Sequence, residues 1–152
     1  MEENVKTNLI ALRRARGEDA AALAELATQL GYPTTADQVQ RRLADLEAHD
    51  FGAVFVAELP GRGVVGWIHV HPARLLEMEP FADLGGLVVA DGSRSMGIGA
   101  ALLQMAENWA RSQGFASLFV RSNVIRAEAH RFYEKQGYRL EKQQKMFRKD
   151  LG

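Results

Sequence analysis

The sequence predicts an α/β fold in which helices flank one mixed sheet, because segments with strand periodicity alternate along the chain with segments of helical periodicity. The length of 152 residues is typical of one domain with one core, so we expect a single domain over 1–152, frayed over residues 1–8. Hydrophobic residues make up 47% of the chain and charged residues 25%, which excludes a disordered protein.

The first third of the chain predicts one strand and two helices. Apolar and polar residues alternate over 9–16, which indicates a short strand. Apolar residues then recur at helical spacing over 23–30 and over 39–46. A Gly-Tyr-Pro-Thr turn separates the two helices, and the second begins with a capping box formed by Thr35 and Gln38.

The middle of the chain changes to strand periodicity. Residues 53–57 and 64–71 predict two strands that are joined as a hairpin across 60–63. Val65, Trp67, His69 and His71 would then share one face of the second strand. A further strand is expected over about 80–90.

The last third predicts two more helices between short strands. An apolar stripe over 98–109 indicates an amphipathic helix that ends at Gly114. A strand over 117–121 and a helix over 128–136 follow. Two last strands are expected over 138–140 and 144–147.

Composition and charge exclude several function classes. The chain has no cysteine, which excludes thiol nucleophiles, thiolate zinc sites and disulfides, and which fits a cytoplasmic location. Nineteen basic and nineteen acidic residues cancel, so the broad positive charge of a nucleic-acid-binding protein is missing. We also expect no membrane association, because the N-terminus is acidic and no apolar run approaches the length of a membrane span.

A glycine-bearing loop between a strand and a helix is the most informative segment of the sequence. Residues 87–100 read as the end of a strand, a loop and the first turn of a helix, whose unpaired amides and positive dipole favour an anion. Arg94 can add a charged contact. The segment lacks the Gly-Lys-Ser/Thr of a nucleoside triphosphate loop and the third glycine of a dinucleotide fingerprint. Close packing of the helix on the sheet is the alternative reason for Gly97 and Gly99.

Two motifs in register resemble the GCN5-related N-acetyltransferase (GNAT) family. Residues 94–99, Arg-Ser-Met-Gly-Ile-Gly, resemble the family's Gln/Arg-x-x-Gly-x-Gly/Ala signature, although Ser95 stands where many members have glycine. Residues 117–138 resemble the family's later segment, which completes the coenzyme site. The element order from Leu9 to Arg148 agrees with the family as well. The resemblance implies a largely antiparallel mixed sheet, the acyl-CoA N-acyltransferase fold.

The resemblance also implies acetyl-CoA as co-substrate and names the residues that would bind it. The amides of 94–100 would hold the pyrophosphate, and the backbone of 87–89 would pair with the pantetheine arm as a strand does. Asn123 would contact the arm, although capping of the next helix is an equally weighted reading. The implied coenzyme residues are Leu87, Val88, Val89, Arg94, Ser95, Met96, Gly97, Ile98, Gly99, Ala100, Asn123, Ala129 and Tyr133.

Catalysis by this family needs an acid, an oxyanion donor and a base. The resemblance places Tyr133 as the general acid toward the coenzyme sulfur, whereas its helical face alone would suit a packed aromatic. We expect the oxyanion donor to be a main-chain amide near Val88. Glu79, Asp83 and His69 are candidate bases, and solvated or rim side chains are the alternative reading for each.

The sequence therefore predicts an acetyl-CoA-dependent N-acetyltransferase. It would transfer the acetyl group to a primary amine of a small molecule or peptide by direct attack through a tetrahedral intermediate, without a metal, because His69 and His71 lack a third ligand. A non-catalytic regulatory module that binds acyl-CoA is the alternative. The last strands would also offer an edge for a homodimer.

Overall fold

The computed structural model describes residues 9–122 and 127–152, so the expected fraying of 1–8 lies outside the described residues. The chain divides into two compact units, Met1–Val120 and Arg121–Gly152. The first unit holds the whole sheet, and the second holds one helix, α5 (Ala127–Lys135). None of the helices in the described part is long and apolar enough to cross a membrane.

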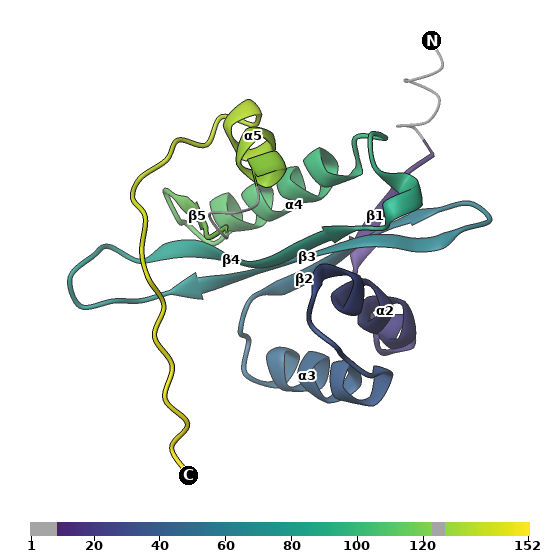
Figure 1. The fold of residues 1–152 in the computed structure, drawn as a ribbon, viewed down its shortest axis with the longest axis horizontal. Coiled ribbons are helices and arrows are strands. Elements are labelled where there is room, and N and C mark those ends of the chain that lie inside the picture. Colours follow the sequence, from purple (N-terminus) through teal and green to yellow (C-terminus); the bar gives the residue numbers. More distant parts are fainter. Residues whose placement is uncertain (1–8, 123–126) are drawn as a thin grey trace. The chain divides into compact units, whose positions relative to one another are not determined.

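The first unit is built on a mixed, mostly antiparallel sheet, as predicted (Figure 1). Neighbouring strands pair in chain order and antiparallel, except for the last pair, which is parallel. The strands are β1 (Ala11–Arg14), β2 (Ala53–Leu59), β3 (Gly63–Ala73), β4 (Phe81–Val89) and β5 (Leu118–Val120).

Helices cover both faces of this sheet. Helices α2 (Ala20–Leu30) and α3 (Ala36–Ala48) lie on one face, and α4 (Ile98–Ser112) lies on the other (Figure 1). Helix α4 buries an apolar stripe that includes Leu102 and approaches β3 closely at Gly66, where an added Cβ would lie 3.1 Å from the Leu102 side chain. A glycine at this position therefore lets α4 pack against the centre of the sheet.

The helix ends confirm the signals that the sequence carries. The Thr35 side chain accepts a hydrogen bond from the Gln38 amide at 3.2 Å, and the Gln38 side chain accepts one from the Thr35 amide at 3.1 Å. This reciprocal pair satisfies two backbone donors at the start of α3. Gly31 ends α2 with a left-handed φ of 113°, a conformation that glycine adopts without steric cost.

Val65 does not share a face of β3 with Trp67, so that part of the prediction is wrong. Val64 packs with Trp67 against the cluster formed by Ala15, Leu23, Leu43 and Val56, and Val65 is buried outside that cluster. The reason is a bulge: Ala57 pairs with Gly66 and Glu58 pairs with Val64, so Val65 has no partner in the register. One extra residue reverses which side chains point to each face.

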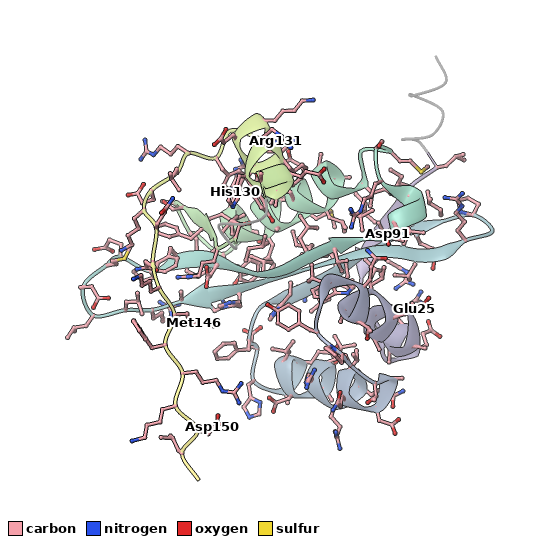
Figure 2. The ribbon with its side chains drawn as sticks, viewed as in Figure 1. Glu25, Asp91, His130, Arg131, Met146 and Asp150 are labelled. Carbon is pink, nitrogen blue, oxygen red and sulfur yellow. The ribbon has the colours of Figure 1, made fainter. Side chains whose placement is uncertain are left out.

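The two strands expected over 138–140 and 144–147 are also wrong. Residues 138–152 form no strand or helix, and apolar side chains there are exposed, 74% for Leu140 and 88% for Phe147. Met146 and Asp150 lie on this extended segment (Figure 2). Alternation along the sequence predicts a strand only where a neighbouring strand accepts the hydrogen bonds, and the described residues provide none here.

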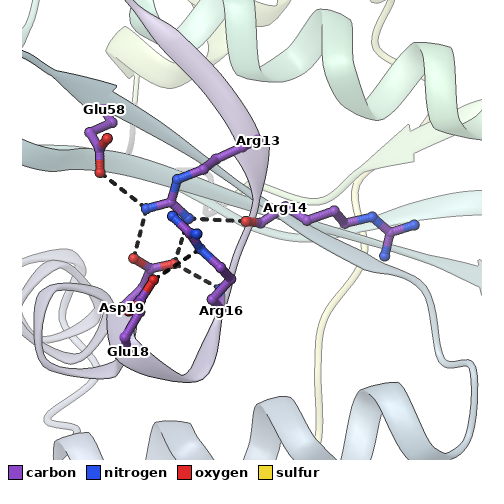
Figure 3. A network of polar contacts seen from close by, with 6 residues as sticks. All are labelled: Arg13, Arg14, Arg16, Glu18, Asp19 and Glu58. Atoms are coloured by element: carbon purple, nitrogen blue, oxygen red, sulfur yellow. Dashed lines mark hydrogen bonds and ion pairs between the residues drawn. The ribbon is translucent and has the colours of Figure 1, made fainter.

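A partly buried ion pair joins β1 to the start of α2 (Figure 3). The Arg13 guanidinium donates to both carboxylate oxygens of Asp19, at 2.8 and 2.9 Å, and to Glu58 at 3.1 Å. The Arg16 amide adds a 2.7 Å hydrogen bond to Asp19, which is only 6% exposed. Hydrogen bonds from Arg13 outweigh the effect of burial and hold the pKa of Asp19 below its ordinary value.

We expect Asp19→Asn to destabilise the protein by about 2–3 kcal/mol at pH 7, because it breaks a bidentate, partly buried pair. A carboxylate whose folded-state pKa is lowered contributes stability above its unfolded pKa and loses that contribution as the pH falls through the folded value. The variant should therefore differ from the wild type most at pH 7 and least near pH 2. Urea unfolding at both pH values measures this, and an equal difference at both would contradict the assignment.

Candidate active site

The C-terminal half of β4 has an edge that no strand covers among the described residues. Strand β5 pairs with β4 only from Ala82 to Leu84. Further along, Ala90 donates to the Val65 carbonyl of β3 at 2.7 Å. Because the backbone groups of a strand alternate in direction, those of Leu87 and Val89 face away from β3. The strand thus presents unpaired backbone groups next to the glycine loop.

A bulge in β4 separates the paired half from the open half. His69 pairs with Gly86 and Val70 pairs with Leu84, so Gly85 is left out of the ladder. A Cβ on Gly85 would lie 2.7 Å from Nδ1 of His69, and one on Gly86 would lie 2.9 Å from the Trp67 ring. Two consecutive glycines therefore let both rings lie directly on the strand at the bulge.

The predicted anion cradle, residues 94–100, spans the end of the loop after β4 and the first turn of α4. Gly97 precedes the helix with a left-handed φ of 80°, and no side chain caps it. The first amides of α4, those of Ile98, Gly99 and Ala100, are consequently available to an anion at the positive end of the helix dipole. Arg94 forms a 3.0 Å ion pair with Asp91 and is 56% exposed, so it can turn toward a ligand.

Two side chains from other elements hold this loop in place. Gln29 of α2 donates to the Val89 carbonyl at 2.9 Å and accepts from the Asp91 amide at 3.2 Å. Arg62 of the β2–β3 hairpin donates to Ser93 Oγ at 3.1 Å, and Ser93 is only 2% exposed. The loop is therefore fixed from both α2 and the hairpin.

Ser95 adopts a left-handed backbone conformation with a φ of 72°, which is strained for a residue with a side chain. We expect Ser95→Gly to raise the free energy of unfolding by about 1 kcal/mol while leaving the affinity for acetyl-CoA within about threefold. Urea unfolding and calorimetric titration measure the two quantities. A lower free energy of unfolding in this variant would contradict the prediction, because it would show that contacts of the Ser95 side chain stabilise the fold by more than the backbone strain destabilises it.

His69, His71 and Asp83 form a cluster of titratable side chains near the bulge. The rings of His69 and His71 lie 5.4 Å apart between centroids, and His71 Nε2 lies 3.6 Å from Asp83 Oδ2. Burial and the neighbouring His71 lower the pKa of His69, against a hydrogen bond that the ring donates to the Phe51 backbone carbonyl, which raises it. Both lowering effects favour the neutral form of the His69 ring.

Two buried ring nitrogens beside the bulge have no hydrogen-bond partner among the described residues, Trp67 Nε1 and His69 Nε2. Buried polar atoms are nearly always satisfied in folded proteins, so an unsatisfied pair marks a position where a ligand or water can bind. The described residues hold no group of three or more His, Asp or Glu side chains arranged to share a metal ion.

The structure brings together most of the predicted coenzyme residues and separates one predicted base. Glu79 is exposed in the loop before β4, which begins two residues later at Phe81. Strand β4 is nine residues long, about 26 Å at 3.3 Å per residue, and Glu79 lies beyond the end of it that is opposite the glycine loop. Asp83 lies inside β4 and is 13% exposed.

The remaining predicted residues lie in or near the second unit. Tyr133 and Ala129 are on α5, where the Tyr133 ring packs edge-on against Phe132 and Tyr138. Asn123 lies outside the described residues. Sequence reasoning missed Gln29 and Arg62, which carry no local signal, and also the Gly85–Gly86 pair, whose position inside a strand indicates a bulge.

Comparisons with known proteins agree with this geometry. Residues 18–138 match the Acetyltransferase (GNAT) family. The chain is 32% identical over 134 residues to the aminoalkylphosphonate N-acetyltransferase of Salmonella typhimurium, covering 84% of each chain. A solved acetyltransferase described as putative, from Agrobacterium tumefaciens, superposes with a TM-score of 0.80 at 23% identity, covering 91% of this chain and 99% of that one.

An aminoglycoside N-acetyltransferase solved in complex with CoA superposes with a TM-score of 0.81 at 16% identity, covering 92% of this chain and 94% of that one. At 16% identity, this structural similarity shows only that the two proteins share a fold. The family match, which spans most of the chain, and the curated relative show more: this protein belongs to the GNAT acetyltransferase family and is an acetyltransferase.

Proposed function

We propose that this acetyltransferase transfers the acetyl group of acetyl-CoA to a primary amine of a small molecule or peptide. The observation that carries the proposal is the uncapped start of α4 directly after the open edge of β4. The amides of 94–100 would hold the pyrophosphate, and the amide of Val89 with the amide and carbonyl of Leu87 would pair with the pantetheine arm. Val88 was also expected to pair with the arm, but its backbone groups face β3. Val88 would therefore make no hydrogen bond to the arm and would only keep its neighbours in the strand.

Bound acetyl-CoA supplies a thioester carbonyl for direct attack by a neutral amine. Such an attack needs a donor for the oxyanion that develops. We expected that donor near Val88, but the Val88 backbone pairs with Trp67 on β3. The bulge at Gly85 releases backbone from the ladder on the same strand, so we propose an amide there as the oxyanion donor.

The base is proposed to be Asp83. An alkyl amine is about one part in a thousand neutral at pH 7, so a group that takes its proton accelerates the reaction. Asp83 lies two residues before the bulge, largely buried and opposite His71. His69, whose lowered pKa favours the neutral ring and whose Nε2 has no partner among the described residues, is the second candidate. The role predicted for Glu79 stays a prediction, and its distance along β4 favours Asp83 over it.

We expect Asp83→Asn to lower kcat/KM for an amine acceptor by about 100-fold, the scale of a lost general base. The change keeps the shape of the side chain, so acetyl-CoA affinity should stay within about threefold. Release of the coenzyme thiol measures turnover. Glu79→Gln is the matched control and should leave kcat/KM unchanged. If His69→Gln abolishes turnover and Asp83→Asn does not, the base is His69.

The proposed acceptor class is a small primary amine. The curated relative is named for an aminoalkylphosphonate, and the relative solved with CoA is named for aminoglycosides. Both names describe small molecules that carry amines. An aromatic and an acidic side chain near the bulge, the partly buried Trp67 and the largely buried Asp83, suit a cationic amine before it loses its proton.

Calorimetric titration with acetyl-CoA tests the proposal. Saturable binding at one site, retained by desulfo-CoA because the pyrophosphate contacts remain, is the expected result. A screen of aminoalkylphosphonates and aminoglycosides for thiol release should then reveal an acceptor. No binding at millimolar ligand would reject the coenzyme site, and binding without turnover on any amine would favour the regulatory module. We also propose a cytoplasmic location, because the chain has no cysteine. We propose no nucleic-acid partner, and the homodimer stays a prediction.

A further inference from the structure

We propose that Gln29 is a positioning residue of the coenzyme site. The proposal rests on the function proposed above, since it concerns how the chain holds the segment that would bind acetyl-CoA. Gln29 lies on α2, 60 residues before the strand end that it contacts. Its side chain reaches the junction between β4 and the cradle, defined here as Val89 to Asp91.

One side-chain amide makes both contacts to this junction. Gln29 Nε2 donates to the Val89 carbonyl at 2.9 Å, and Gln29 Oε1 accepts from the Asp91 amide at 3.2 Å. A primary amide presents the same donor and acceptor as a peptide group. Gln29 therefore takes the place of a neighbouring strand for the last backbone groups before the loop.

The junction is held from two opposite sides. On one side the Ala90 amide donates to the Val65 carbonyl of β3 at 2.7 Å. On the other side Gln29 binds the groups of the residues before and after Ala90. The direction in which the chain leaves β4 is thereby fixed, and with it the position of the first amides of α4, which follow within one short loop.

Gln29 also determines which backbone groups remain for a ligand. The Val89 carbonyl faces away from β3, toward the same edge as the Leu87 groups. Because Gln29 occupies that carbonyl, the groups left on this edge are the Val89 amide and the amide and carbonyl of Leu87. A pantetheine arm that pairs with β4 is then restricted to one register, with its pyrophosphate end at the cradle.

The position of Gln29 separates this role from a general contribution to folding. Gln29 is exposed and is not part of the buried core. Methionine has similar length and helix propensity but can make neither hydrogen bond. We therefore expect Gln29→Met to keep the thermal midpoint of unfolding within about 3 °C of the wild type.

Calorimetric titration with acetyl-CoA tests the proposal directly. We expect Gln29→Met to raise the Kd about tenfold, the scale of one to two neutral hydrogen bonds, and Gln29→Glu to raise it at least as much, because a carboxylate cannot donate to the Val89 carbonyl. Glu25→Ala is the matched control, one turn earlier on α2 and exposed (Figure 2). This variant should bind as the wild type does.

Amide hydrogen exchange supplies a readout that does not need a ligand. The Asp91 amide should exchange faster in Gln29→Met than in the wild type, whereas the Ala90 amide, bound to β3, should keep its protection. An unchanged Kd in both Gln29 variants, or unchanged exchange at Asp91, overturns the role of Gln29. Absence of acetyl-CoA binding in the wild type rejects the proposed function itself, so the two failures are distinguishable.

Discussion

Gly99→Trp is expected to abolish acetyl-CoA binding, which is the largest effect that we predict for a single substitution. Gly99 is in the first turn of α4, among the amides that would hold the pyrophosphate. An indole there would occupy the space of the phosphate oxygens and cover the amides. Calorimetric titration should show saturable binding for the wild type and none for the variant at millimolar ligand.

A tryptophan elsewhere on the same helix controls for a general effect of the large side chain. Gln104 is exposed on α4, and its side chain contacts Asn108 one turn later. Gln104→Trp should fold and bind acetyl-CoA with the affinity of the wild type. If Gly99→Trp is folded by circular dichroism and still binds, the start of α4 is not the phosphate site.

Tyr133→Phe is expected to lower turnover at least tenfold while changing the free energy of unfolding by less than about 1 kcal/mol. The variant keeps the ring that packs against Phe132 and Tyr138 and removes only the hydroxyl. The ordinary pKa of a phenol is higher than that of a thiol, so Tyr133 can protonate a departing thiolate only when its hydroxyl is well positioned. Thiol release under saturating acetyl-CoA measures the effect.

Tyr138→Phe is the matched control for that experiment. Tyr138 lies in the same unit, and its ring centroid is 5.9 Å from that of Tyr133. The control variant removes a hydroxyl from the same aromatic pair, so it should retain the turnover of the wild type. Equal turnover in the wild type and Tyr133→Phe would assign Tyr133 a packing role.

The sequence predicts most of this fold because its local signals agree with one another. A capping box at Thr35, a left-handed glycine at Gly31 and the apolar run of β2 each act over a few residues, and each appears in the structure. The glycine loop is equally local: a strand end, two glycines and an amphipathic helix suffice to predict the passage from β4 into α4.

Features that depend on pairing between distant segments could not be predicted. The two glycines indicate a bulge, but which residue leaves the ladder depends on the register of β4 against β3, and the rings of Trp67 and His69 that lie over the glycines come from that distant strand. The start of β4 is likewise set by pairing, because the strand begins where β3 pairs with it, at Phe81, and leaves Glu79 in the preceding loop.

The uncovered edge of β4 has a consequence for solubility. Backbone groups that face outward from a strand form a template on which another chain can add a strand, and folded proteins usually protect such edges. Here the Gln29 side chain blocks one of these groups, and the bulge at Gly85 twists the strand just before the others. A ligand that pairs with Leu87 and Val89 would cover the remaining outward groups of the strand. Without the ligand, the edge that binds it would be open to strand addition by another chain, and the protein would be more prone to aggregate.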